Sequence, residues 1–205
     1  MTLTTLHVAF VWMLKLRFRK LHFVALTVGA VIPDIEPLVA WVFGWSVFCG
    51  WDFPCSLAPD RLVLHSIVGA ITIDVVLTLI FVKIIGKLGI ERLGICGFSN
   101  VKTNAAFFMS AAIGSLSHVL VDWLHHPANP IFWPFFVDGS YYVDGLLLSF
   151  MAVLPASIIV ATISAAITVA VIARTLDKSG YSFWLVLSNP AKALSLITES
   201  LGKAN

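Results

Sequence analysis

Long apolar segments, separated by short stretches that carry the basic residues, constrain the fold of this chain more than any other feature. Of the 205 residues, 59% are hydrophobic and only 12% are charged, whereas soluble domains have about 25% charged residues. Five apolar segments stand out, at 3–14, 22–46, 62–85, 104–124 and 144–173. The pattern predicts an all-α, polytopic helical membrane protein, with residues 1–205 forming a single integral-membrane domain.

The two ends of the chain differ from the middle. The segment 3–14 gives only about 18 Å of helix, so we expect it to be tilted or half-buried. The fifth segment, which contains Pro155 as an expected kink, has no charge after Asp144 and is interpreted as structural. The tail, 181–203, has a helical apolar pattern and is expected to lie on the membrane surface.

The basic residues predict an orientation. If the stretch 15–20 is placed inside and the segments alternate, all of the 13 lysines and arginines except Arg61 fall on the inner side. This places the chain in a membrane, most simply a prokaryotic cytoplasmic membrane. It also places Cys49 and Cys55 outside, where a disulfide is permitted. The basic residues form no patch that would indicate a nucleic-acid partner.

The second apolar segment is interrupted by Pro33-Asp34-Ile35-Glu36-Pro37. Two prolines four residues apart predict that the helix breaks between Pro33 and Pro37. On a regular helix the carboxylates of Asp34 and Glu36 would point in different directions, but an unwound segment can direct both to one point. Broken membrane helices occur where they line a cavity or are buried in protein. Pairing with Lys or Arg is the alternative, but the segment 3–14 contains neither, and the segment 62–85 contains only Lys83, near its far end.

The fourth segment ends with a histidine and an aspartate four residues apart, His118 and Asp122, followed by His125 and His126. Residues at this spacing lie on one helix face and can bind a single ion. A hydrogen bond between the two side chains without a metal is the alternative. Ionisable groups in an apolar segment are costly, which favours a functional role.

Further histidines extend this cluster. His65 is predicted in the first turn of the third segment, and Asp74 should lie about 180° around that helix, where it would contact another helix or support a ligand. His7 is either a packed core residue or a ligand. Counting about 1.5 Å per residue, five of the six histidines collect in the outward half with Asp34, Glu36 and Asp122, and His22 is the exception. This clustering predicts one site.

Imidazole and carboxylate ligands without well-spaced thiols suit a divalent metal, zinc first, with manganese or iron as alternatives. The ligand number leaves room for one or two ions. A metal-bound water can act as a hydroxide near neutral pH, and a carboxylate that does not bind the metal can act as general base.

The order of these motifs resembles the YdjM-type family of membrane-bound metal-dependent hydrolases. The matching elements are His7, the PDIE stretch, His65-Ser66, the run GSLSHVLVDWLHH and IFWPF. They cover a metal-site core at about 5–136, while the fifth helix and tail at 144–205 show no likeness. His125 stands where the family usually has Thr, so either His125 or His126 takes the last ligand role.

The family is distantly similar in its ligand pattern to zinc-dependent phospholipase C, which implies phosphoester hydrolysis at a His/Asp metal cluster. The implied and candidate metal ligands are His7, Asp34, Glu36, His65, His118, Asp122 and His126. The candidate catalytic residues are Glu36, Asp34 and His126.

Three functions compete. The first is a membrane-embedded hydrolase that acts on a lipid-borne ester, expected to be a phosphoester, at the outer leaflet. Its partners would be membrane lipid and a lipid-like substrate, and the sequence is compatible with a homo-oligomer. The second is a cation- or proton-coupled transporter that uses Asp34, Glu36 and Asp74. The third is an intramembrane peptidase, but Ser115 and Ser117 do not face His118 on a helix, and no H-E-x-x-H motif is present.

Overall fold

The chain folds into helices in the computed structural model, which describes residues 5–42, 61, 63–88, 101–126, 129–135, 143–182 and 185–202. The elements are α1 (Thr5–Arg17), α2 (Phe23–Gly29), η1 (Ile32–Asp34), α3 (Ile35–Val42), α4 (Ile67–Ile71), α5 (Ile73–Leu88), α6 (Ala105–His125), η4 (Leu146–Ser149), α7 (Val153–Lys178), α8 (Leu185–Ser188) and α9 (Pro190–Gly202). Within these ranges the only extended pairing is an isolated bridge between Asn129 and Val143. The all-α prediction is confirmed. Cys49, Cys55 and Cys96 lie outside the described residues.

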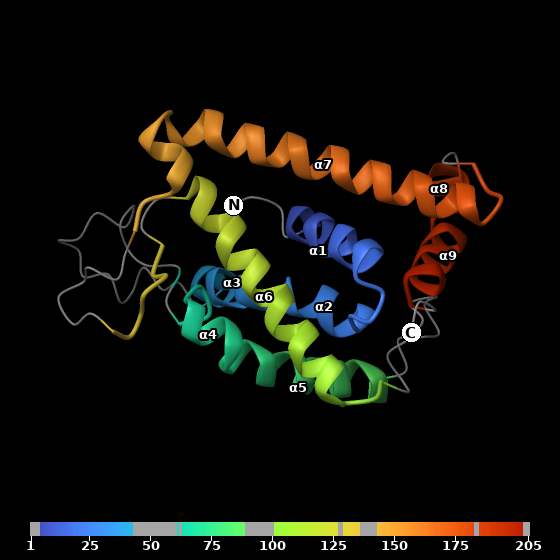
Figure 1. The fold of residues 1–205 in the computed structure, drawn as a ribbon, viewed down its shortest axis with the longest axis horizontal. Helices are drawn as coiled ribbons and strands as arrows, with labels where there is room; N and C mark the ends of the chain where they lie inside the picture. Colours follow the sequence, from blue (N-terminus) through green and yellow to red (C-terminus); the bar gives the residue numbers. More distant parts are fainter. Residues whose placement is uncertain are drawn as a thin grey trace.

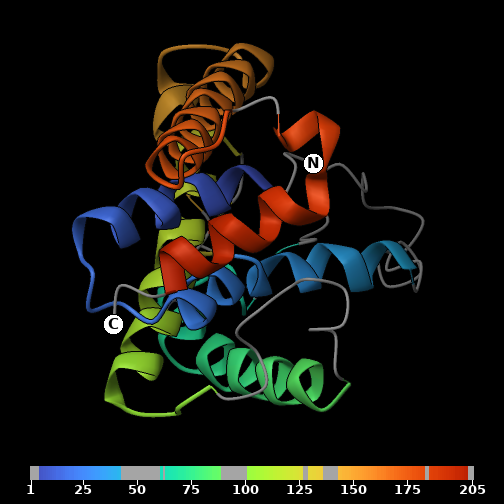
Figure 2. The same cartoon turned by 90° about the vertical axis from the view of Figure 1, so that its right-hand side faces the viewer.

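Helix α6 crosses the molecule between α7 at one edge and α5 at the other, and α1 and α2 lie between these edges (Figure 1). The view from the side shows the same separation of α7 from α5, with α9 packed across one end (Figure 2). One apolar core joins α2, α5, α6, α7 and α9. Its buried members are Phe23, Val24, Ala25, Val28, Ile32, Val82, Phe107, Ala111, Leu176, Ala193, Ile197 and Leu201.

Small residues allow α2 and α6 to approach closely. A Cβ atom added at Gly29 would overlap the carbonyl oxygen of Ala111, and one added at Gly114 would overlap that of Leu26. The fourth segment contains several small residues, and these contacts show that they permit close helix packing. The close approach also brings Ala30, at the C-terminal end of α2, to within hydrogen-bond distance of His118 on α6.

We expect Gly114→Val to destabilise the protein by about 1–3 kcal/mol, because the added methyl groups must push α2 away from α6. Ala105→Val, at the exposed start of the same helix, is the matched control for introducing a β-branched residue. The measurement is the thermal unfolding midpoint in detergent. Equal midpoints for the two variants would contradict the close contact at Gly114.

The predicted break in the second segment is present. The short 3-10 turn η1 separates α2 from α3, and Pro33 lies in it. Pro37 lies in the first turn of α3, where its missing N–H removes no helical hydrogen bond. The backbone therefore changes direction at Pro33, and Pro37 is compatible with the helix that follows.

The third segment differs from the prediction of a single helix with His65 in its first turn. Ser66 caps α4 by accepting a hydrogen bond from Gly69 N, so His65 lies before the helix begins. The chain then leaves helical geometry at Thr72, where φ is −120° and ψ is −79°, before α5 starts at Ile73. Because of this break, the predicted angle between His65 and Asp74 does not apply.

The structure bears on two predictions for the C-terminal part. Pro155 is the third residue of α7, where a proline fits the first turn, so it is not a kink within the helix. The tail was expected on a membrane surface, but Ala193, Ile197 and Leu201 of α9 are buried in the core. The apolar face of α9 is therefore occupied by the bundle.

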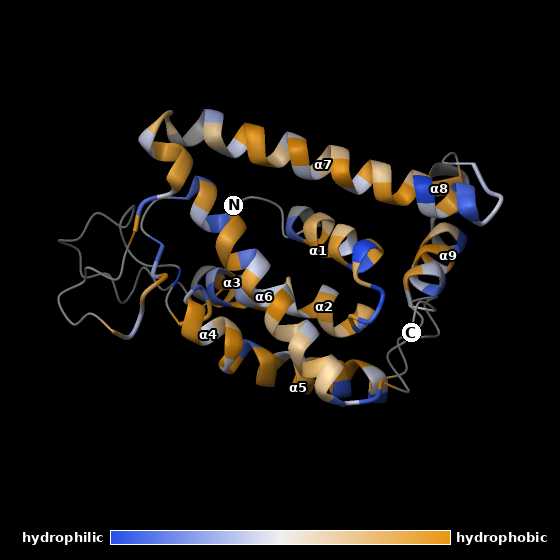
Figure 3. Ribbon diagram, in the orientation of Figure 1, coloured by the Kyte–Doolittle hydropathy of each residue, from blue (hydrophilic) through white to orange (hydrophobic). Residues whose placement is uncertain are grey.

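Two described helices are long and apolar enough to cross a membrane, α6 and the part Pro155–Lys178 of α7. Outer faces of α5 and α7 are also apolar (Figure 3). Exposed aliphatic and aromatic side chains on these two helices are Ile73, Val76, Ile80, Phe81, Ile84, Leu88, Ile158, Ile159, Ile163 and Val169. Such wide apolar faces are rare on water-soluble monomers.

Candidate metal centre

Asp122 lies at the centre of a buried cluster of imidazoles. It is on the last turn of α6 and is 1% exposed. Its Oδ1 atom lies 3.2 Å from His7 Nε2 and 3.7 Å from His126 Nε2. Its Oδ2 atom lies 3.5 Å from His65 Nε2 and 3.6 Å from His118 Nε2. One carboxylate is thus shared by four histidines from three parts of the chain.

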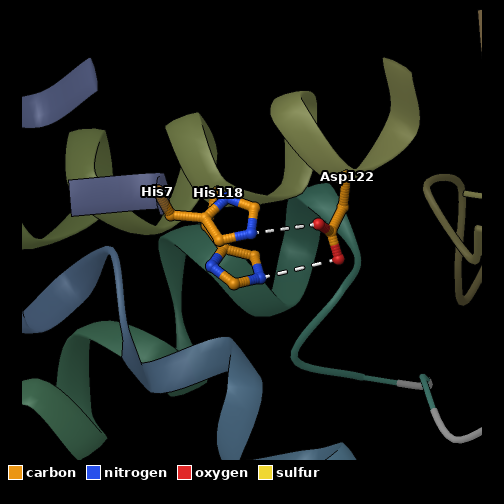
Figure 4. A group of neighbouring side chains, drawn as sticks. All are labelled: His7, His118 and Asp122. Carbon is orange, nitrogen blue, oxygen red and sulfur yellow. Dashed lines mark ion pairs between the residues drawn. The ribbon is translucent and has the colours of Figure 1, made fainter. Parts of the chain in front are cut away.

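The rings of His7 and His118 stack on each other with centroids 3.8 Å apart, and both rings face Asp122 (Figure 4). His7 comes from α1, whereas His118 comes from α6. The ring of His65 meets His118 edge-on at 5.3 Å. Two stacked imidazoles that direct nitrogens to one carboxylate are an unusual core arrangement, because each ring brings a polar atom into the same buried space.

Hydrogen bonds on the far sides of two rings determine which nitrogen faces the centre. His118 Nδ1 donates to Ala30 O at 2.8 Å. His65 Nδ1 lies 3.0 Å from Glu36 Oε2 and donates to it. A histidine that donates through Nδ1 presents the lone pair of Nε2 to the centre, which is the usual arrangement of a metal-binding histidine.

The inward-facing atoms are buried without hydrogen-bond partners. They are His65 Nε2, His118 Nε2, Asp34 Oδ2 and both carboxylate oxygens of Asp122. Their separations of 3.5 and 3.6 Å are longer than a charge-assisted hydrogen bond of about 2.7–2.9 Å. Ligand atoms at 2.0–2.1 Å from a tetrahedral metal are about 3.3 Å apart. For His65 and His118 the spacing therefore fits a shared cation better than direct hydrogen bonds, whereas His7 Nε2, at 3.2 Å from Asp122 Oδ1, lies within hydrogen-bond distance. These buried groups can hold a metal ion.

The two carboxylates of the broken segment have different surroundings. Glu36 accepts hydrogen bonds from Leu64 N at 3.0 Å and from His65, so it orients this histidine. Asp34 Oδ1 lies 3.6 Å from His118 Nε2, and its side chain is 18% exposed. The expectation that both carboxylates reach one point is therefore correct only for Asp34. Glu36 contacts the centre through His65.

His125 and His126, at the C-terminal end of α6, also lie beside Asp122. His125 Nδ1 donates to Val121 O at 2.9 Å, which orients the ring. Ligand atoms of Asp122, His125 and His126 lie close enough together to hold one ion. Burial, reinforced by the positive charge of Arg61, lowers the pKa of His126 to about 3, so its imidazole is neutral at pH 7. The sequence left open whether His125 or His126 takes the last ligand role. In the structure, both histidines lie beside the Asp122 carboxylate.

Asp74 is not part of this cluster. It is fully buried, and its carboxyl group accepts a hydrogen bond from Ser115 on α6, three residues before His118. The predicted contact between Asp74 and a partner helix is confirmed. His22, the predicted exception among the histidines, caps α2 and packs against Phe107 at 5.5 Å.

Arg61 was missed as a site residue in the sequence. Its Nε atom lies 3.2 Å from Asp122 Oδ2, and the side chain is 11% exposed. A signal for it existed, because it is the one basic residue that the orientation argument places on the outer side. Asn129 was also missed; it is buried and donates from Nδ2 to His126 O at 2.6 Å.

No protein-family model, curated protein or solved structure matches this chain. Function is therefore inferred from the chemistry of the cluster.

Proposed function

We propose that this protein is a membrane-embedded, metal-dependent hydrolase that cleaves a lipid-borne phosphoester. The observation that carries the proposal is the convergence of buried, unpartnered Nε2 atoms of His65 and His118 on the carboxylate oxygens of Asp122 and Asp34. Lone pairs facing carboxylates repel each other unless a cation lies between them. A divalent ion compensates this repulsion and brings a reactive centre.

The ligand atoms form three overlapping groups, each close enough together to hold one ion: His7, His118 and Asp122; Asp34, His65 and His118; and Asp122, His125 and His126. His118 belongs to the first two groups, and Asp122 belongs to the first and the third. Together they would hold one or two ions, with zinc preferred and manganese or iron as alternatives. When bound, such ions lower the pKa of water and polarise a phosphoryl oxygen. Glu36 would orient His65 from behind.

Two side chains are suited to act on the substrate. Asp34 lies at the partly exposed edge of the cluster and would accept a proton from the attacking water. Arg61 lies against Asp122, where its guanidinium group would bind phosphoryl oxygens. An arginine beside a His/Asp cluster favours a phosphoester over a carboxylic ester, because the phosphoester carries a negative charge throughout the reaction.

The lipid substrate is inferred from the surroundings of the cluster. The exposed apolar faces of α5 and α7 would contact acyl chains, and we propose that the five apolar segments make the protein polytopic. The positive-inside rule then places the C-terminal end of α6, with Asp122, on the outer side. The resemblance to YdjM-type hydrolases supports the same reaction. A head group would reach the cluster at the level of the outer leaflet.

The first experiment is metal analysis of detergent-purified protein by inductively coupled plasma mass spectrometry, without metal-affinity purification. We expect one or two equivalents of a transition metal in the wild type and loss of metal in His118→Asn. His22→Asn is the matched control, because asparagine retains helix-capping ability and His22 lies outside the cluster. Hydrolysis of a chromogenic phosphodiester should fall with the metal and return when it is added back.

Metal-free wild-type protein, or equal metal in the two variants, would contradict the hydrolase proposal. The transporter alternative would then be tested by proton or cation flux in liposomes, with Asp34→Asn as the variant. A metal-loaded protein without phosphoesterase activity but with ion-dependent flux would also favour transport.

A further inference from the structure

A cavity lies away from the metal cluster, lined by residues of α1, α7 and α9; the ends of these helices meet at one end of the bundle (Figure 1). It has a volume of about 280 Å³. It is lined by Lys15, Leu16, Arg19, Arg174, Thr175, Lys178, Ser200 and Leu201. Lys15 follows His7 by eight residues on α1, a rise of about 12 Å, so the cavity is separate from the proposed hydrolase site.

The lining of this cavity is cationic. Four of the eight residues that line it carry a positive charge, and none of these eight carries a negative one. Two more, Thr175 and Ser200, supply hydroxyl groups. The cations come from α1, from the turn after it and from the last two turns of α7, so the tertiary fold brings them together. Like charges placed around one space repel each other, and a bound anion would relieve that repulsion.

Lys15 shows that this is more than a set of solvated basic residues at helix ends. Its side chain is 1% exposed, and its Nζ atom donates to Arg19 O at 2.8 Å and Leu21 O at 2.6 Å. Burial lowers the pKa of its ammonium group, and an anion in the cavity would stabilise the charged form. Helix dipoles and topology explain exposed basic residues, but neither requires a buried lysine at the wall of a cavity.

We propose that this cavity binds a phosphate group, either the phosphodiester of an anionic phospholipid head group or free inorganic phosphate. Guanidinium groups from Arg19 and Arg174 match the geometry of phosphate oxygens, and the ammonium groups of Lys15 and Lys178 add charge. The volume equals the space of roughly nine waters at about 30 Å³ each, enough for a phosphate group and its hydration. The positive-inside rule places the cavity at the inner leaflet.

Bound phosphate would also connect three parts of the chain. Arg19 follows α1, Arg174 lies on α7 and Ser200 lies on α9. The C-terminal helix would be held to the bundle by the anion in addition to its buried apolar residues Ala193, Ile197 and Leu201. The site does not depend on the proposed hydrolase reaction.

The test is native mass spectrometry of the full chain in detergent, titrated separately with phosphatidylglycerol, phosphatidylcholine and inorganic phosphate. The variant Arg174→Gln/Lys178→Gln removes two exposed cations of the cavity, and Lys83→Gln/Lys87→Gln removes two exposed cations of α5 that do not line it. We expect the affinity for phosphatidylglycerol to be at least about tenfold higher in the wild type and the control than in the cavity variant. Metal content should be equal in all three proteins.

The arms of this experiment separate the two sources of phosphate. Binding of phosphatidylglycerol with little effect of inorganic phosphate identifies a lipid site, while saturable binding of inorganic phosphate that the cavity variant loses identifies a free-anion site. The proposal would be overturned if the cavity variant and the control bound phosphatidylglycerol equally well and also bound inorganic phosphate equally well. It would also be overturned if the wild type bound phosphatidylcholine as tightly as phosphatidylglycerol and did not bind inorganic phosphate. Arg19→Gln provides a second variant should the double substitution impair folding, which circular dichroism would reveal.

Discussion

Asp122→Asn is expected to abolish metal binding, with a loss of affinity greater than about 100-fold. Substitution of a group that only orients a metal ligand lowers metal affinity by about 10–100-fold. Asp122 is itself a proposed ligand, so its loss should lower the affinity further. Its two oxygens lie within 3.7 Å of nitrogens from His7, His65, His118 and His126. Asparagine keeps the shape of the side chain but removes the negative charge on which the proposed metal binding depends.

The neighbouring carboxylate provides a graded comparison. Asp34 is partly exposed and meets only His118 among the described imidazoles within ion-pair distance, so Asp34→Asn should weaken metal binding less than Asp122→Asn. Asp177→Asn, an exposed change on α7 away from the cluster, is the control for loss of a negative charge. Isothermal titration of metal-stripped protein with zinc measures all three. An equal, small effect of Asp122→Asn and Asp177→Asn would show that Asp122 is only an ion-pair partner of the histidines.

Much of this cluster could be predicted from the sequence because its strongest signals are local. His118 and Asp122 share a helix face however the helices pack, because four residues make about one helical turn. Two prolines around Asp34 predicted a break, which the turn η1 confirms. Segment order and helix rise predicted that His7 and His65 would lie near Asp122, and the distances of 3.2 and 3.5 Å from their Nε2 atoms to its carboxylate confirm it. These inferences needed no knowledge of which helices touch.

What the sequence could not supply depends on tertiary contacts. The role of Glu36 follows from its hydrogen bonds to His65 and Leu64, which the chain brings together from positions 28 and 29 residues apart. The break at Thr72 has no proline or glycine at that position to indicate it. The burial of α9 depends on the shape of the core, since an amphipathic helix fits a membrane surface and a protein groove equally well.

Arg61 illustrates a different reason for failure. The predicted orientation places Arg61 alone among the basic residues on the outer side, and the sequence analysis treated it only as an exception to the topology rule. A charge that departs from such a rule needs a specific partner. That partner is Asp122, at 3.2 Å. Basic residues on the outer side of a membrane segment that also contains histidines and carboxylates should therefore be examined as site residues.

Arg61→Lys is expected to lower kcat/KM for a phosphoester by about 100-fold, the lower end of the range for loss of one transition-state hydrogen-bond donor. Lysine keeps the positive charge beside Asp122 but lacks the planar guanidinium that binds two phosphoryl oxygens at once. Metal content should stay at the wild-type level, because a cation does not coordinate a metal. Arg17→Lys, an exposed change at the end of α1, should leave both properties unaltered.

Three results separate a role in the reaction from a role in structure. If Arg61 binds the reacting phosphoryl group, Arg61→Lys should lose activity toward a phosphodiester with metal content and unfolding midpoint unchanged. If Arg61 only balances the charge of Asp122, the lysine variant should retain full activity, and Arg61→Ala alone should lower stability. Loss of metal in Arg61→Lys would mean that the guanidinium positions Asp122 as a ligand. Only the first result agrees with substrate binding by Arg61, because it alone places the effect after the metal has been bound.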